Sequence, residues 1–139
     1  GSGAANFNSD SWAALTEDQR AFMLRAAADN VAEITIRYNN AAQEALAAAE
    51  ARGIAISEAS PALMEASASF VEGDVAVIAS QFSSSYGIQG VDEKIVIIRD
   101  LITRWGELAA GLEQDPQAFG ALLWDEVFSR VNPAEYGLR

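Results

Sequence analysis

The chain has no cysteine and no histidine, and Lys94 is its only lysine. These absences exclude disulfides, Cys-His and Ser-His-Asp nucleophile chemistry, and zinc or haem sites with the usual ligands. Nine Lys and Arg residues stand against 20 Asp and Glu residues, a formal net charge of -11. A surface of that sign repels phosphate, so nucleic acid and anionic membrane faces are poor partners. The composition suits a binding protein better than a catalyst, and we expect no cofactor.

Long apolar runs are also missing. Strictly apolar runs are short, such as residues 95–98, whereas a helix needs roughly 20 apolar residues to span a bilayer. We therefore expect no membrane insertion. Residues 1–3 look like a tag remnant, which leaves residues 4–139 as a single mainly helical domain or fragment.

The sequence predicts one very long helix over residues 17–52. Thr16 and Gln19 form a capping box, apolar or small residues then recur at spacings of three and four, and no Gly or Pro intervenes before Gly53. Such a helix is about 54 Å long, whereas a compact globule of this size is on the order of 37 Å across. It must bend or overhang, and an overhanging apolar stripe needs cover from another part of the protein or from a second copy.

Residues 53–57 alternate small and β-branched side chains, which predicts a short strand. A single strand has no partner in an otherwise helical chain, and its unpaired backbone groups are costly to bury. This segment therefore also calls for a partner.

Three further helices are predicted. One opens at Ser60-Pro61, a second is capped by Asp92 and continues past Leu108 to Leu112, and the last opens at Asp115-Pro116. Residues 83–87 are the expected loop between the first two of these helices. The fold class is mainly α, with four helices and one short strand.

Neighbouring carboxylates can perform acid-base chemistry when burial separates their pKa values. Three such pairs occur, namely Glu17/Asp18, Asp92/Glu93 and Asp125/Glu126. The first two pairs lie in the first turns of predicted helices, where the helix dipole favours acidic residues. The third pair lies on a polar face. The spacings of a calcium loop and of a di-iron bundle are absent. We assign no catalytic residue and no metal site, and expect that the chain is not an enzyme.

Arginine is the natural partner of a small carboxylate ligand. Four arginines were considered for this role, namely Arg25, Arg37, Arg99 and Arg104. Each has an acidic residue within about one helical turn, such as Asp29 for Arg25 and Glu33 for Arg37, so solvated ion pairs are expected. The ligand-binding residues remain unknown. Core packing is expected for the three tryptophans, Trp12, Trp105 and Trp124.

Two stretches of the chain resemble a known family. Residues 8–19, Asn8-Ser9-Asp10-Ser11-Trp12-Ala13-Ala14-Leu15-Thr16-Glu17-Asp18-Gln19, with the alanine-rich helix behind them, are similar to the segment N-x-x-x-W-x-x-L-x-x-x-Q. That segment occurs in solute-binding proteins of tripartite ATP-independent periplasmic (TRAP) transporters of the DctP type. The C-terminal stretches 104–108, 115–119 and 123–138, which end in Asn132-Pro133-Ala134-Glu135-Tyr136-Gly137-Leu138, resemble the tail of one branch of that family.

The resemblance implies that the chain is the C-terminal segment of a two-domain α/β periplasmic binding protein. One long helix spans both domains in that family, and the strand at 53–57 would join a sheet formed upstream. Family members capture organic acids through an arginine and deliver them to membrane permease subunits. No arginine of this chain aligns with that residue, so the resemblance implies a periplasmic fragment that does not bind the ligand alone.

A different class of protein also fits the sequence. The chain can be a self-standing helical interaction protein, in which a second copy covers the exposed apolar stripe. We expect a homo-oligomer formed through the long helix and the strand. Both interpretations can hold together, because a fragment can associate through the surface that its missing part would cover.

Overall fold

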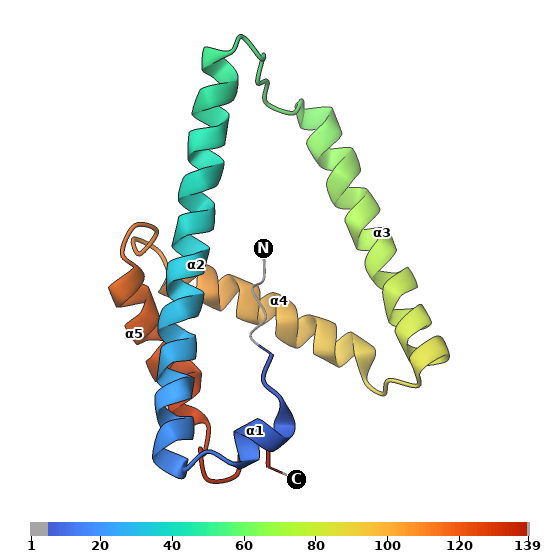
Figure 1. The fold of residues 1–139 in the computed structure, drawn as a ribbon. Coiled ribbons are helices and arrows are strands. Elements are labelled where there is room, and N and C mark those ends of the chain that lie inside the picture. Colours follow the sequence, from blue (N-terminus) through green and yellow to red (C-terminus); the bar gives the residue numbers. More distant parts are fainter. Residues whose placement is uncertain (1–5, 139) are drawn as a thin grey trace. The chain divides into compact units, whose positions relative to one another are not determined.

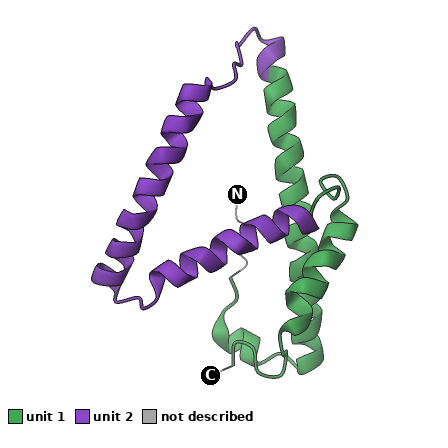
Figure 2. Ribbon diagram, turned by 180° about the vertical axis from the view of Figure 1, so that it is seen from behind, with its two compact units in different colours: residues 1–48, 109–139 green, residues 49–108 purple. Residues whose placement is uncertain are grey.

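The computed structural model describes residues 6–138, and within that range the chain is helical and contains no strand (Figure 1). The elements in chain order are α1 (Ser9–Ala13), α2 (Glu17–Ala51), α3 (Pro61–Tyr86), α4 (Val91–Leu108), α5 (Pro116–Glu126) and the 3-10 helix η1 (Phe128–Arg130). The chain divides into two compact units (Figure 2): unit 1 comprises residues 1–48 and 109–139, and unit 2 comprises residues 49–108.

The predicted strand at 53–57 is wrong, and with it the α/β assignment, because residues 6–138 form no sheet. The backbone here ends a helix instead. Gly53 adopts the left-handed conformation (φ 74°), and the N–H groups of Gly53 and Ile54 donate to the carbonyls of Glu50 (2.9 Å) and Ala49 (3.0 Å). These bonds satisfy carbonyls at the end of α2. The rest of the segment has no neighbouring strand, so its alternating pattern leaves Ile54 and Ile56 exposed.

The predicted long helix is present as α2, which ends one residue before the expected position. Its capping box forms as expected: the Thr16 N–H donates to Gln19 Oε1 (2.9 Å), and the Gln19 N–H donates to Thr16 Oγ1 (3.2 Å). The buried residues of α2 recur at every fourth position, at Arg20, Leu24, Ala28, Ala32 and Ile36. No α2 residue after Ile36 is buried. The apolar stripe is therefore covered only along the first half of the helix.

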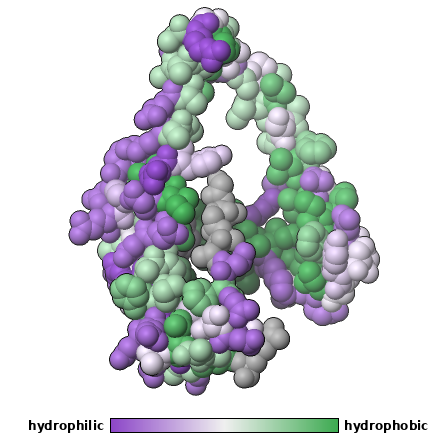
Figure 3. All heavy atoms as spheres, in the orientation of Figure 1, coloured by the Kyte–Doolittle hydropathy of each residue, from purple (hydrophilic) through white to green (hydrophobic). Residues whose placement is uncertain are grey.

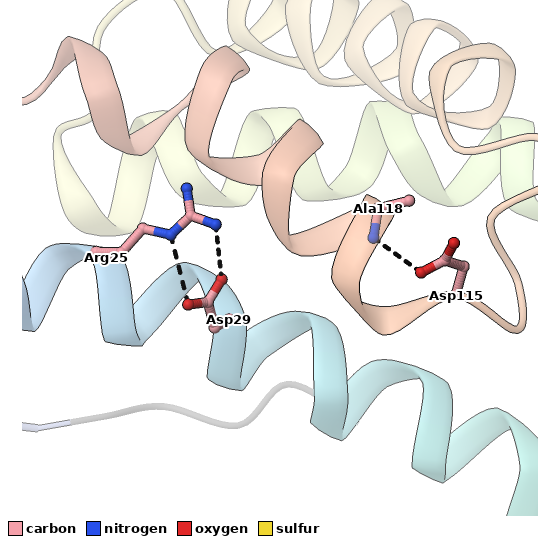
Figure 4. Close-up of polar contacts among 4 residues, drawn as sticks. All are labelled: Arg25, Asp29, Asp115 and Ala118. Carbon is pink, nitrogen blue, oxygen red and sulfur yellow. Dashed lines mark hydrogen bonds and ion pairs between the residues drawn. The ribbon is translucent and has the colours of Figure 1, made fainter.

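A short helix, α1, precedes α2 and is not predicted from the sequence. Asn8 caps α1, because its Oδ1 accepts from the Ser11 N–H at 2.9 Å. The last helix opens as predicted, since Asp115 Oδ1 accepts from the Ala118 N–H at 2.9 Å (Figure 4). Within unit 1, α5 packs against α2 at the buried Gly120, where small side chains allow the two backbones to approach closely.

Unit 2 contains α3 and α4. Ser60 and Pro61 open α3 as predicted, but the loop expected at 83–87 is wrong, because α3 continues through Tyr86 and stops at Gly87 (φ 65°). Serine is only a moderately poor helix former, so the residues before Gly87 remain helical.

The start and the end of α4 also differ from the expectation. The Lys94 N–H donates to the Gly90 carbonyl (3.1 Å), so Asp92 lies in the first turn and does not cap the helix. At the other end, α4 stops at Leu108, which leaves Leu112 outside the helix.

Gly73 within α3 and Gly87 at its C-terminal cap should respond oppositely to substitution by alanine. Gly73 is a helix-interior glycine with nothing within 4 Å of an added Cβ, whereas Gly87 has a positive φ. We expect Gly73→Ala to raise helix stability by about 0.5–1 kcal/mol, and Gly87→Ala to lower it, because alanine disfavours the left-handed conformation. Thermal melts followed by circular dichroism measure both effects. A loss of stability in Gly73→Ala would contradict the continuous α3.

Candidate binding surfaces

The N-terminal segment and the C-terminal tail of unit 1 meet at Trp12. This side chain is only 9% exposed, and its indole Nε1 donates to the Tyr136 carbonyl oxygen at 2.7 Å. The indole also makes edge contacts with the rings of Phe7 (5.6 Å between centroids) and Tyr136 (6.2 Å). Gly137 lies against the indole so closely that a Cβ there would be 3.0 Å from Nε1. We call this contact the Trp12 tie.

Arg20 makes a second link between the same two segments. The residue is 7% exposed, and its Nε donates to the Pro133 carbonyl at 2.7 Å while Nη1 donates to the Leu15 carbonyl. A buried guanidinium is costly unless its donors are satisfied, and these two carbonyls accept from it. Arg20 is not among the residues that the sequence predicts for a site. The sequence signal for its burial is its position four residues before Leu24, on the buried stripe of α2.

An apolar pocket of about 470 Å³ lies beside the Trp12 tie in unit 1. Aromatic side chains of Trp12, Phe128 and Tyr136 line it, with Ser9 and Asn30 among the polar groups. No charged side chain is among its lining residues. Its volume lies within the roughly 300–1,000 Å³ range of small-molecule sites, but it offers no cation to a carboxylate ligand.

A smaller pocket of about 280 Å³ lies between α2 and the loop before α5. Thr35, Asn39 and Phe119 are among its lining residues, and its one charged side chain is Glu113. Hydrogen bonds from the backbone N–H groups of Glu113 and Gly111 lower the pKa of the Glu113 carboxyl. The Gly111 N–H lies 3.1 Å from Glu113 Oε1. A carboxylate that stays ionised repels an anionic ligand from this pocket.

The pKa of Glu113 is directly measurable. We expect its carboxyl carbon to titrate below the ordinary glutamate range in an NMR pH series, with the Gly111 amide shifting at the same midpoint. Since the folded pKa is lowered, any stabilisation from this contact is present above the ordinary pKa and is lost as the pH falls through the folded value. An ordinary pKa would mean that these backbone hydrogen bonds do not form.

The four candidate arginines are divided between the units, with Arg25 and Arg37 in unit 1 and Arg99 and Arg104 in unit 2. Arg25 pairs with Asp29 as predicted (3.2 Å, Figure 4) and lies 5.3 Å from the centroid of the Trp124 ring. Arg99 pairs with Glu72 of α3 (2.9 Å), a partner that sequence proximity does not indicate. Arg37 and Arg104 are exposed positions on α2 and α4.

The carboxylate pairs lie where helix geometry places them. Glu17/Asp18 and Asp92/Glu93 occupy the first turns of α2 and α4. In the third pair, Glu126 joins Arg130 in an ion pair at 2.9 Å. Across residues 6–138, no three acidic side chains gather closely enough to hold a metal ion.

Unit 2 presents its apolar residues at the surface. Only Ala79 is buried in α3, and no residue of α4 is buried. Figure 3 shows apolar side chains gathered over α3. The exposed large side chains include Leu63, Met64, Phe70, Val77, Ile97, Ile98 and Ile102. Large exposed apolar patches occur at protein or membrane interaction sites and in ligand-binding grooves.

Comparison with protein-family models, curated proteins and solved structures finds no match to this chain. None of the helices within residues 6–138 is long and apolar enough to cross a membrane.

Proposed function

We propose that the chain is the C-terminal part of an extracytoplasmic solute-binding protein, which serves TRAP-type uptake of a small organic acid in the periplasm. Its role is non-enzymatic, and its partners are the organic acid and the membrane permease subunits. The observation that carries the proposal is the Trp12 tie. It joins residues 124 positions apart, one from each of the two stretches on which the resemblance depends.

The Trp12 tie explains why these residue types occur in both motifs. The tryptophan of the N-terminal motif needs an acceptor for its buried indole N–H, and the Tyr136 carbonyl supplies one. The following residue, Gly137, must be small because a Cβ there would lie only 3.0 Å from the indole Nε1. A motif at each end of the chain is thus explained by one contact, which supports interpreting them as parts of one family pattern.

The distribution of charged side chains supports the proposal that this chain does not bind the organic acid by itself. Neither of the pockets of about 470 and 280 Å³ offers a cation, and the guanidinium groups of Arg25 and Arg99 already face carboxylates. In the family that the sequence resembles, an arginine of a preceding segment binds the ligand carboxylate. The ligand site is then completed by a part of the protein outside residues 1–139.

Calorimetry tests this proposal. We titrate a C4 dicarboxylate and a short 2-keto acid into this chain, and into the longer protein that its gene encodes. We expect no measurable binding by the chain and 1:1 binding by the longer protein. Tight 1:1 binding of either acid by the 139-residue chain would overturn the proposal.

The apolar surface of unit 2 favours a second candidate function, a self-standing helical interaction protein. Its exposed residues on α3 and α4 call for a covering partner. Sedimentation separates the outcomes: a stable oligomer supports this role, and a clean monomer with a cooperative melt counts against it.

A further inference from the structure

We infer that α4 is a self-association helix, which pairs in antiparallel fashion with α4 of a second copy of this chain. The inference deepens the second candidate function, on which it rests, and it does not depend on the transport proposal. Its starting point is the apolar seam of α4, formed by Val91, Ile95, Ile98, Ile102 and Trp105. These residues are separated by four, three, four and three positions, which is the a/d spacing of a helix that packs against another helix.

The seam is apolar throughout and is available in unit 2. Ile98 and Ile102 are 55% and 68% exposed, although they lie in the middle of the helix. The contact with α3 involves Arg99, which pairs with Glu72. Arg99 directly follows the seam residue Ile98, so it occupies the flanking e position of the heptad and is not part of the seam. α3 therefore leaves these central seam positions largely uncovered.

The charge distribution favours a second copy as the occupant. Two chains of net charge -11 repel each other. The electrostatic repulsion that opposes self-association is therefore smallest where the least charged helices meet. Four acids and three bases give α4 a net charge of -1, whereas three acids without a base give α3 a net charge of -3. α2 carries six acids and three bases, also -3. Among the helices of more than ten residues, α4 therefore has the smallest net charge.

The flanking charges select the antiparallel orientation. In a parallel pair, Lys94 at a g position would face Arg99 at the following e position of the second copy, which is repulsive. In an antiparallel pair with Ile95 opposite Ile98 of the second copy, Asp92 and Arg99 face each other at the e positions. Symmetry produces this ion pair twice, and Val91 lies opposite Ile102 in the outer layers.

Arg99 can serve both contacts. Its side chain is 48% exposed while it pairs with Glu72 at 2.9 Å. A guanidinium has five N–H donors, so one carboxylate leaves donors for Asp92 of the second copy.

The first experiment compares two substitutions on the full chain by sedimentation velocity. Ile98→Glu places a carboxylate in the seam, and Val96→Glu places one outside it at a side chain of nearly equal exposure, 55% against 56%. We expect the unaltered chain and Val96→Glu to be dimers, and Ile98→Glu to dissociate with a dissociation constant at least about 100-fold higher. A monomeric unaltered chain, or equal dissociation of both variants, would overturn the inference.

The second experiment tests the orientation by exchanging charges. Asp92→Arg and Arg99→Asp should each weaken the homodimer roughly tenfold, because each creates two like-charge contacts. An equimolar mixture of the two variants should form heterodimers, in which both contacts again join opposite charges. Asp100→Arg, on the outer face of α4, is the control and should leave dimerisation unchanged. Absence of heterodimers in the mixture would overturn the antiparallel register.

A third variant distinguishes failure of this inference from failure of the interaction role. Leu46→Glu alters an exposed apolar residue of α2 and should leave the dimer intact. If this variant dissociates the dimer while Ile98→Glu does not, association occurs through the long helix. That result would overturn the α4 seam and leave the interaction role standing.

Discussion

Replacing Trp12 with alanine is expected to lower the free energy of unfolding of unit 1 by about 3–5 kcal/mol. The side chain is 9% exposed and contacts two aromatic rings. Its removal opens a cavity beside an existing pocket of about 470 Å³ and leaves the Tyr136 carbonyl without its indole donor. Since small domains are stable by only about 5–15 kcal/mol, we expect the C-terminal tail to detach from α1.

Hydrogen exchange of α2 and α5 amides under increasing urea measures this loss within unit 1. Trp12→Phe retains a ring and removes the N–H donor, so it should cost less, about 1–3 kcal/mol. Tyr38→Ala is the matched control, because Tyr38 is an α2 aromatic that is 63% exposed, and it should change stability by only about 0.5 kcal/mol. Equal effects of Trp12→Ala and Tyr38→Ala would contradict the tie.

Replacing Gly120 with leucine should destabilise unit 1 by disrupting the packing of α5 against α2. Even a Cβ at this position would lie 3.0 Å from Asp29 Oδ1 and 3.6 Å from the Ala32 Cβ. A leucine side chain extends further and must push α5 away from α2. Leucine is a better helix former than glycine, so the expected loss of about 1–3 kcal/mol comes from packing.

Gly73→Leu provides the control for that substitution. Gly73 is also a helix-interior glycine, but nothing lies within 4 Å of an added Cβ. The Gly73→Leu variant should gain up to about 1 kcal/mol of stability from helix propensity. A thermal melt of each variant measures the difference. If both leucine variants are equally stable, α2 and α5 do not pack at Gly120.

The starts of α2, α3 and α5 were predictable because their signals are local. Thr16 and Gln19 exchange hydrogen bonds across three positions, and Ser60 and Asp115 each accept from the N–H three residues later. Such bonds depend on the residue types and their spacing alone. The strand at 53–57 was wrong because a strand requires a neighbour, which alternation in the sequence cannot supply.

The contacts of the candidate site were not predictable from the sequence. The Trp12 indole meets a backbone carbonyl 124 residues away, and Arg20 meets one 113 residues away. Backbone carbonyls carry no residue-type signal, so neither partner stands out in the sequence. The tryptophan was expected to pack in a core, as it does, but its hydrogen bond to the tail follows only from the fold.

The two proposals concern different parts of the chain. Unit 1 has a small core that includes Trp12 and Arg20. The second half of α2 lies outside this core, and its Tyr38 and Leu46 are exposed. Unit 2 has almost no core, and its α4 carries an apolar seam. Cover for α2 by a preceding segment and cover for α4 by a second copy are compatible, and the variants above test them separately.

The intact mass of the mature polypeptide, recovered from its source organism with an antibody against this chain, tests the central claim most directly. The 139 residues have a mass of 14.8 kDa. If residues 4–139 are the C-terminal part of a solute-binding protein, the recovered polypeptide will be much heavier and will contain these residues at its C-terminal end. A mature polypeptide of about 14.8 kDa would contradict the account.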